Sequence, residues 1–231
     1  MEELSFLQRF AVWAIPVLFA ITVHETAHGW MALRLGDPTA KMLGRLTLNP
    51  VRHIDPVGTV LVPGVLLLLG GFLFGWAKPV PITWDNLRHP RRDTAWVAAA
   101  GPLSNLLMAL FWAIVIRIGL MIGNGSEGLA LFLIYAGMAG IYINTVLALL
   151  NLLPLLPLDG GRIMESLLPG PLAWKFSRLE AYGLPILLLL LFTGILGKIL
   201  GPPLVLLVML MGSIAGLKEE TTIYLLQTLL P

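Results

Sequence analysis

Long uninterrupted apolar runs are the feature that most constrains this chain. Three of them, at roughly residues 10–31, 94–122 and 129–153, reach or exceed the ~20 residues that a helix needs to cross a bilayer. We therefore predict that each run forms a membrane-spanning helix. Hydrophobic residues make up 57% of the chain and charged residues only 12%, which is typical of a polytopic membrane protein and excludes an ordinary soluble domain.

Two further apolar regions are interrupted by helix-breaking residues. Residues 58–74 contain Pro63 and a glycine pair, and residues 184–217 contain Gly201-Pro202-Pro203, so both could be spans or re-entrant segments. The sequence thus predicts an all-α polytopic membrane protein with about five to six transmembrane helices and a short re-entrant or β-like element near its functional site. We expect a single integral-membrane domain over residues 1–231, with a core at about 10–165 and C-terminal accessory helices at about 182–217.

The basic residues predict the orientation of the chain. They gather in residues 34–52, 78–92 and 153–182, whereas the 123–128 turn has an acidic residue and no cation. The positive-inside rule places the three basic loops in the cytoplasm. If residues 58–74 crossed the bilayer once, their two basic flanks would lie on opposite sides, so we expect this segment to enter and return. The net charge of +2 and the scattered cations indicate topology signals, not a nucleic-acid-binding surface.

A motif typical of metal-dependent hydrolysis lies within the first apolar run. His24-Glu25-Thr26-Ala27-His28 matches H-E-x-x-H, whose two histidines lie on one helix face and can bind one ion. Glu25 is adjacent to that face, where its carboxylate can take a proton from a metal-activated water. A chance match is the alternative, but three ionisable groups within an apolar span are costly unless they are paired or functional. The chain has no cysteine, so a metal must be held by nitrogen and oxygen, which suits zinc.

A third ligand must come from elsewhere, because catalytic zinc generally has three protein ligands and one open position. Asp159 follows Pro154 and Pro157, which prevent an intact helix and allow the carboxylate to turn inward. Counting the spans places it at the same membrane face as the C-terminal half of the first helix. The alternative is that Asp159 only caps a following helix. His53 is the rival ligand, although a loop histidine beside prolines is more often solvated or locally bonded.

Two motifs in the expected order carry a family resemblance. Residues 24–28, together with Asn-Leu-Leu-Pro-Leu-Leu-Pro-Leu-Asp-Gly-Gly-Arg at 151–162, resemble the site-2 protease family of intramembrane zinc metalloproteases. That family combines H-E-x-x-H on one transmembrane helix with N-x-x-P-x-x-P-x-D-G on a later one. The resemblance runs from about residue 20 to 165, and it is to the compact form of the family, because we expect no room here for a PDZ or CBS domain.

The resemblance also implies roles for individual residues. His24, His28 and Asp159 would hold one Zn²⁺ per chain, and Glu25 would be the general base. Asn151 matches a family asparagine that resembles an electrophilic helper, and its amide could donate to the developing oxyanion. A hydrogen bond between helices or to a freed carbonyl is the structural alternative for Asn151.

Two further segments are candidate auxiliary elements. Asn105 lies in a segment that resembles the family's G-P-x-x-N element and is expected to open a helix after Gly101-Pro102. Asn105 could assist substrate binding or serve helix packing. Residues 75–82 alternate apolar residues with prolines, which suits an extended edge that binds substrate by strand addition. A membrane-entry turn anchored by tryptophans is the alternative reading of residues 75–82.

The sequence as a whole predicts an intramembrane zinc metalloprotease that hydrolyses peptide bonds within or near the transmembrane segment of membrane-protein substrates. Its expected partners are a single-span membrane protein and the lipid bilayer, with no nucleic acid. We expect a multi-pass protein of the cell membrane whose active site faces the cytoplasm. The alternatives are an inactive metal-binding membrane adaptor, which would be free to lose Glu25, and a small transporter, since polar residues in broken helices also suit an ion pathway.

Overall fold

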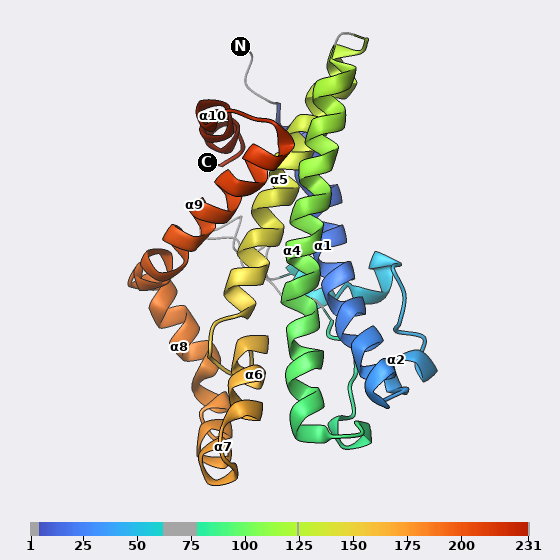
Figure 1. Cartoon of the computed structure of the whole chain (residues 1–231), viewed down its shortest axis with the longest axis vertical. Helices are drawn as coiled ribbons and strands as arrows, with labels where there is room; N and C mark the ends of the chain where they lie inside the picture. The colour runs from blue at the N-terminus through green and yellow to red at the C-terminus, as the bar shows by residue number, and fades with distance from the viewer. Residues whose placement is uncertain (1–4, 62–77, 124, 231) are drawn as a thin grey trace.

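The structure, a computed structural model, describes residues 5–61, 78–123 and 125–230. Within these ranges the chain forms helices, turns and connecting segments without a β-strand, which confirms the predicted all-α class. Four helices are long and apolar enough to cross a membrane (Figure 1): α1 (Phe6–Leu35), α4 (Pro90–Ile122), α5 (Glu127–Asn151) and α9 (Ile195–Ala215). The shorter elements are α2 (Thr39–Met42), η1 (Pro50–His53), η2 (Pro56–Leu61), η3 (Trp84–Asn86), α6 (Asp159–Leu167), α7 (Gly170–Ser177), α8 (Glu180–Phe192) and α10 (Glu219–Leu229).

Helices α1, α4 and α5 pack together as the central bundle. Glycines on α5 permit the closest approach: a Cβ on Gly137 would lie 3.0 Å from the carbonyl oxygen of Trp112, and one on Gly140 would collide with the Trp112 ring. Ile116 and Met138, from the two facing helices, are fully buried between them. Small residues thus bring two membrane helices into direct contact, which the apolar environment alone would not do.

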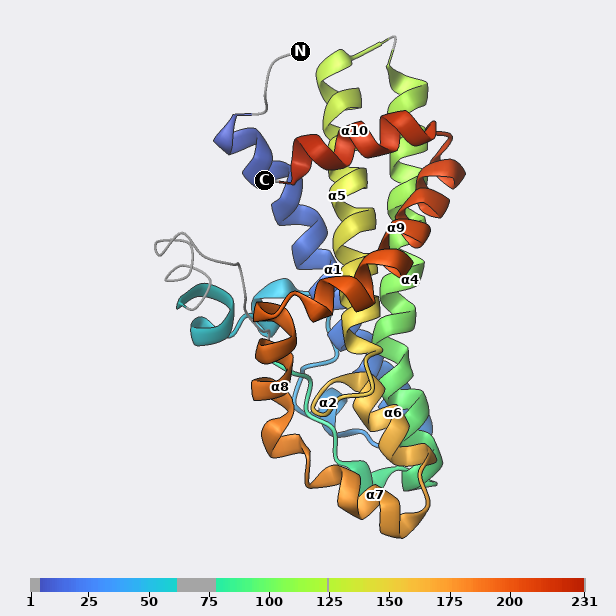
Figure 2. The ribbon, with the colours of Figure 1, turned by 90° about the vertical axis from the view of Figure 1, so that its left-hand side faces the viewer.

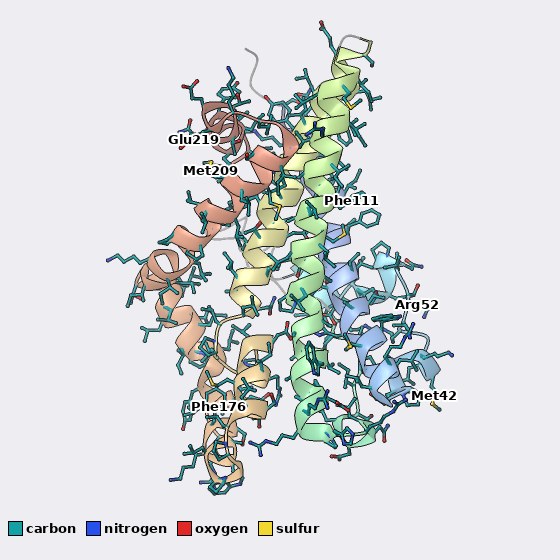
Figure 3. All side chains as sticks on the ribbon, viewed as in Figure 1. Met42, Arg52, Phe111, Phe176, Met209 and Glu219 are labelled. Atoms are coloured by element: carbon teal, nitrogen blue, oxygen red, sulfur yellow. The ribbon has the colours of Figure 1, made fainter. Side chains whose placement is uncertain are left out.

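The outer surface of the bundle is apolar. On α4, Phe111 points away from the bundle (Figure 3) and is half exposed, while its neighbour Trp112 is buried. The other long helices likewise have buried residues on the face toward the bundle and exposed leucines, isoleucines or valines on the outer face. An exposed apolar surface of this extent is expected where the surrounding medium is hydrocarbon.

Short helices gather at the two ends of this bundle. Figure 2 shows α6, α7 and α8 near the end where α4 begins, and α10 across the opposite end, near both chain termini. The long connection between α5 and α9 therefore folds back along the lower part of the bundle. Its first helix, α6, packs on α4 and brings residues from beyond α5 next to α1 and α4.

The positions of the helix breaks differ from the prediction. The sequence suggested a break at Gly201-Pro202-Pro203, but α9 continues through both prolines, and the chain bends instead at Gly194, whose φ is 72°. A left-handed residue of this kind ends a helix at little cost only when it is glycine. Pro102 likewise lies inside α4, so that helix does not open after it. Neighbouring helices and local adjustment can satisfy the backbone groups that proline frees inside a membrane.

The number of spans is settled only for the described part of the chain. Residues 58–74, predicted to enter the membrane and return, lie largely outside the described residues, which stop at the end of η2 and resume at Lys78. The described helices therefore supply four candidate spans, and α8 is too short to be counted with them. The total of five to six and the re-entrant segment remain predictions. Residues 78–83 are described, and they form neither helix nor strand.

A buried carboxylate fixes the chain where it leaves α1. Asp37 is fully buried and accepts hydrogen bonds from the Thr39 backbone and hydroxyl, from the Thr83 amide at 2.8 Å and from the Asn86 side chain at 3.0 Å. Burial alone would raise the pKa of Asp37, but these hydrogen bonds outweigh it and lower the pKa below its ordinary value. Asp37 thus holds the 83–86 region against the end of α1, and the preceding 78–83 segment must run back along that helix.

Candidate metal centre

The two motif histidines lie one helical turn apart on the face of α1 that meets α4 and α6. Both are buried, each about 8% exposed, and their Nε2 atoms are 3.1 Å apart. Asp159, the first residue of α6, places Oδ2 3.3 Å from the Nε2 of His24 and 3.4 Å from the Nε2 of His28. The three residues predicted as ligands therefore converge, although more than a hundred positions separate Asp159 from the histidines.

The Asp-Gly-Gly sequence explains how α6 reaches this position. After α5 ends, residues 152–158 form tight turns, and α6 then folds back against them. A Cβ on Gly160 would collide with the backbone of Leu152, and one on Gly161 would lie 2.5 Å from the carbonyl carbon of Leu155. The two glycines are thus required because backbone passes directly over backbone. This close approach carries Asp159 toward α1. Asp159 is the first residue of α6, whose N-cap is Leu158 and has no side-chain capping hydrogen bond, so the capping alternative is not supported.

A chain of buried hydrogen bonds fixes the protonation of His24. Asn144 on α5 donates its amide N–H to the Gly140 carbonyl, so its oxygen is free to accept a hydrogen bond from Asn105 Nδ2 at 2.9 Å. Asn105 also donates to the Ala20 carbonyl, which leaves its own Oδ1 as an acceptor 2.6 Å from His24 Nδ1. Nδ1 of His24 must therefore carry the proton. Its Nε2, which faces the cluster, presents a lone pair.

The second histidine is oriented in the same way by backbone. Nδ1 of His28 lies 2.7 Å from the carbonyl oxygen of Val97 on α4, which can only accept a hydrogen bond. Nε2 of His28 is therefore also unprotonated when the ring is neutral. Metal-binding histidines almost always donate their second ring nitrogen in this manner, to a carbonyl or an amide oxygen that fixes the ring.

The geometry of the three facing atoms fits a bound cation. Two nitrogen lone pairs and a carboxylate oxygen point at one another, and Oδ2 of Asp159 is buried without a hydrogen-bond partner among the described residues. Such an arrangement is repulsive unless a positive charge lies between the atoms. Zinc bonds of about 2.0–2.2 Å in a tetrahedral site would place ligand atoms about 3.3–3.6 Å apart. The observed separations of 3.1, 3.3 and 3.4 Å are close to that spacing.

Gly101 on α4 leaves the room that this centre needs. A Cβ at this position would collide with Nε2 of His28 and would lie 2.6 Å from Cε1 of His24. The glycine therefore forms one wall of the cluster, directly beside the atoms that would bind the metal. In the sequence, Gly101 is distinguished only by its place in the G-P-x-x-N segment. Its contact with the histidines could not be predicted, because it depends on how α4 packs against α1.

Glu25 lies beside the cluster and not within it. Its side chain is half buried, and Oε2 accepts a hydrogen bond of 2.7 Å from the backbone N–H of Val80. The carboxylate thus lies between α1 and the 78–83 segment, next to His24 in sequence. Glu25 thus lies next to His24 on α1 and beside the face that carries the histidines, and its role as general base remains a prediction.

Of the remaining predicted residues, His53 and Asn151 are not among the residues of the cluster, whereas Asn105 contacts it. Nε2 of His53 is 2.9 Å from the Thr47 carbonyl, and His53 is absent from the three-ligand group, the only such group within the described ranges. Its role as a rival ligand is therefore not supported, and it is buried, not solvated. Asn151 donates Nδ2 to the Leu147 carbonyl, one turn earlier in its own helix α5, and its oxyanion role remains a prediction. Asn105 contacts His24 directly, and its auxiliary role remains a prediction as well.

A helical membrane fold with a buried His–His–Asp centre and a glutamate beside it defines the class of membrane-embedded zinc hydrolases. Comparison with known proteins agrees with this class. A family profile described as peptidase family M50 matches residues 118–193, which include the Asn151–Gly160 motif. No solved structure matches the chain.

Curated relatives extend the match over most of the sequence. YwhC of Bacillus subtilis, whose name places it among the zinc metalloproteases, is 42% identical over 195 residues, or 82% of this chain and 84% of YwhC. A protein of Mycolicibacterium smegmatis with a similar name is 30% identical over 199 residues, 85% of this chain and 73% of that protein. The regulator of sigma-E protease RseP of Escherichia coli is 31% identical over 121 residues, 49% of this chain and 27% of RseP. The chain belongs to peptidase family M50, the site-2 proteases, and is a multi-pass membrane zinc metalloprotease.

Proposed function

We propose that this protease hydrolyses peptide bonds within or near the transmembrane segment of a single-span membrane protein. The observation that carries the proposal is the convergence of His24 Nε2, His28 Nε2 and Asp159 Oδ2 inside a membrane-spanning bundle, with Glu25 alongside. Because the centre lies among apolar membrane helices, a membrane segment can reach it through the bilayer.

The three converging residues would hold one Zn²⁺ per chain and leave a fourth position open. When bound, zinc supplies a Lewis acid that polarises a carbonyl and lowers the pKa of a water molecule. Asn105 and the Val97 carbonyl hold the two imidazoles in the required tautomer. These supporting contacts fix the ring planes before any ion arrives, which reduces the cost of organising the centre.

Glu25 performs the proton transfers. It accepts a proton from the attacking water as the water oxygen forms a bond to the carbonyl carbon of the scissile peptide. It then delivers that proton to the amide nitrogen as the carbon–nitrogen bond breaks, so the products are a carboxylate and an amine. Oε2 is held by the Val80 amide, and Oε1 is left for the water.

The orientation follows from the charges around the centre. Of the fifteen Lys and Arg residues, four lie in residues 34–52, four in 78–92 and three in 162–178. These segments adjoin the end of α1 that carries the motif and the end of the bundle where α6 and α7 gather (Figure 2). By the positive-inside rule this end faces the cytoplasm, and we propose that the active site opens toward it in the cell membrane.

The test uses purified protein and a panel of single-span reporter substrates. Cleavage should occur with wild type, disappear with Glu25→Gln, stop on chelation and return when zinc is added. Zinc content should approach one ion per chain and fall in Asp159→Ala. If the protein binds zinc through these residues but cuts no reporter, the adaptor alternative replaces the protease proposal. If Glu25→Gln retains full activity, the assigned base is wrong.

A further inference from the structure

The 78–80 segment is docked on the face of α1 that carries Glu25. The Val80 amide donates to Glu25 Oε2 at 2.7 Å, and the Val80 side chain is buried, 6% exposed. One turn further along α1, a Cβ on Gly29 would lie only 2.9 Å from Cγ1 of Val80, so the glycine provides the seat for the valine. Glu25 and Gly29 thus form a second functional face of α1, next to the face that carries His24 and His28.

The sequence around Val80 restricts what this segment can do. Pro79 and Pro81 flank Val80, and neither has a backbone N–H. The Val80 amide is therefore the sole backbone donor of the three residues, and the prolines fix two of the three φ angles. A stiff segment with one donor can place a hydrogen bond at one point with little conformational freedom.

Contacts from the preceding loop hold this segment in place. Nη2 of Arg45 donates to the carbonyl oxygens of Lys78, at 3.0 Å, and Pro79, at 3.3 Å. The Lys78 amide in turn donates to the His53 carbonyl at 3.0 Å. A single charged side chain thus bridges the two carbonyls that immediately precede Val80. Charge-assisted hydrogen bonds of this type are stronger than neutral ones.

The loop that carries Arg45 is itself anchored to α1. The Thr47 carbonyl accepts the hydroxyl of Thr26 at 2.8 Å and lies 2.9 Å from Nε2 of His53. Thr26 follows Glu25 directly in sequence. The contacts therefore form a closed circuit that leaves α1 at Thr26, passes through the 45–53 loop and the 78–80 segment, and returns to α1 at Glu25.

This circuit affects the orientation of Glu25, the proposed general base, because a carboxylate rotates easily about its last torsion angle. Anchoring Oε2 on the Val80 amide fixes the plane of the group and leaves Oε1 in one place. We propose that Arg45 is a positioning residue of the protease: through the backbone of residues 78–80 it orients Glu25 for proton transfer. The inference rests on the proposed function of Glu25. It adds that the 78–80 segment, which contacts Glu25, determines the direction of the base.

The experiment compares zinc-loaded wild type with Arg45→Ala and Arg45→Lys on a single-span reporter that the wild type cleaves. Arg45→Ala should lower kcat by about tenfold, as expected when a catalytic group loses its alignment. KM should change by less than about twofold, and zinc content should stay at the wild-type level, because no ligand contacts Arg45. Arg45→Lys should recover part of the rate, since an ammonium can reach at least one of the carbonyls. Arg52→Ala is the matched control: this exposed arginine of the same loop points outward (Figure 3) and should behave as wild type.

Amide hydrogen exchange gives a readout that does not depend on turnover. In a peptide covering residues 78–82 the Val80 amide should exchange slowly in wild type, and faster in both Arg45→Ala and Glu25→Ala. A wild-type kcat in Arg45→Ala would refute the positioning role, and a raised kcat would show that the contact restrains the base instead. If no form of the protein cuts a reporter, the proposed function fails. Unchanged Val80 exchange in Arg45→Ala would then refute the circuit independently.

Discussion

Gly101→Ala should separate metal binding from folding. A Cβ at residue 101 would lie 2.5 Å from Cε1 of His28 and collide with its Nε2, whereas ordinary van der Waals contact begins at 3.4 Å. The imidazole would have to move by at least about 0.9 Å to relieve the contact at Cε1, but its Nδ1 is held by the Val97 carbonyl at 2.7 Å. Metal sites tolerate ligand displacements of only about 0.2 Å. We expect zinc affinity to fall by about 100-fold, the upper end of the loss seen when a supporting contact is removed.

The fold should survive this substitution. Alanine is more favourable than glycine in a helix interior by about 1 kcal/mol. This gain offsets part of the free-energy cost of any displacement of α1 from α4. The assay is zinc per chain after equilibration with graded chelator, together with thermal unfolding of the metal-free proteins. Gly197→Ala on α9 is the control, because a Cβ there would meet nothing within 4 Å. If Gly101→Ala retains wild-type zinc affinity, the packing of α4 against the two histidines described above is wrong.

Three further predictions follow from the polar contacts. Asp159→Asn should lose most zinc binding while keeping the helical circular dichroism of wild type, because it removes the anionic ligand and preserves the shape of the side chain. Asn105→Leu should weaken zinc binding about 10- to 100-fold in a chelator titration, because His24 Nδ1 loses its acceptor. Asp37→Ala should lower the free energy of unfolding by about 3 kcal/mol in denaturant titrations, because buried donors lose their acceptor. The pKa of Asp37 is lower in the folded state than in the unfolded state. The ionised carboxylate therefore contributes its full stabilisation above the unfolded pKa of about 4, and this stabilisation is lost as the pH falls through the folded pKa. The melting temperatures of wild type and Asp37→Asn should converge at that low pH.

The candidate ligands could be predicted because their signals are local in sequence. The spacing of His24, Glu25 and His28 places them on adjoining faces of one helix whatever the rest of the chain does. Asp159 could be predicted as a candidate ligand because the prolines before it exclude a continuous helix. Counting the spans then places it at the same membrane face as the histidines. The all-α class followed from the length of the apolar runs, since only helices or closed barrels satisfy the backbone in lipid.

Other features could not be predicted because they depend on packing between distant segments. The role of Gly101 requires knowledge that α4 crosses α1 at its histidines, and the contacts of Arg45 require the path of a loop. The bend at Gly194 was missed because the Gly-Pro-Pro sequence is the stronger local breaker in water. Inside a bilayer, neighbouring groups satisfy what proline frees, so a left-handed glycine can decide where the helix ends.

The buried asparagines have a consequence for how a substrate can enter. Asn105, on α4, donates its two amide protons to Ala20 of α1 and Asn144 of α5, and its oxygen contacts His24 of α1, so three helices are cross-linked at one side chain. Separating any two of them would leave a polar group unpaired in hydrocarbon, at a cost of about 1–3 kcal/mol for each broken bond. Helices α1, α4 and α5 are therefore expected to stay together around the His24–His28–Asp159 cluster. For the proposed membrane-segment substrate, we expect any opening to come from the elements that surround these three helices.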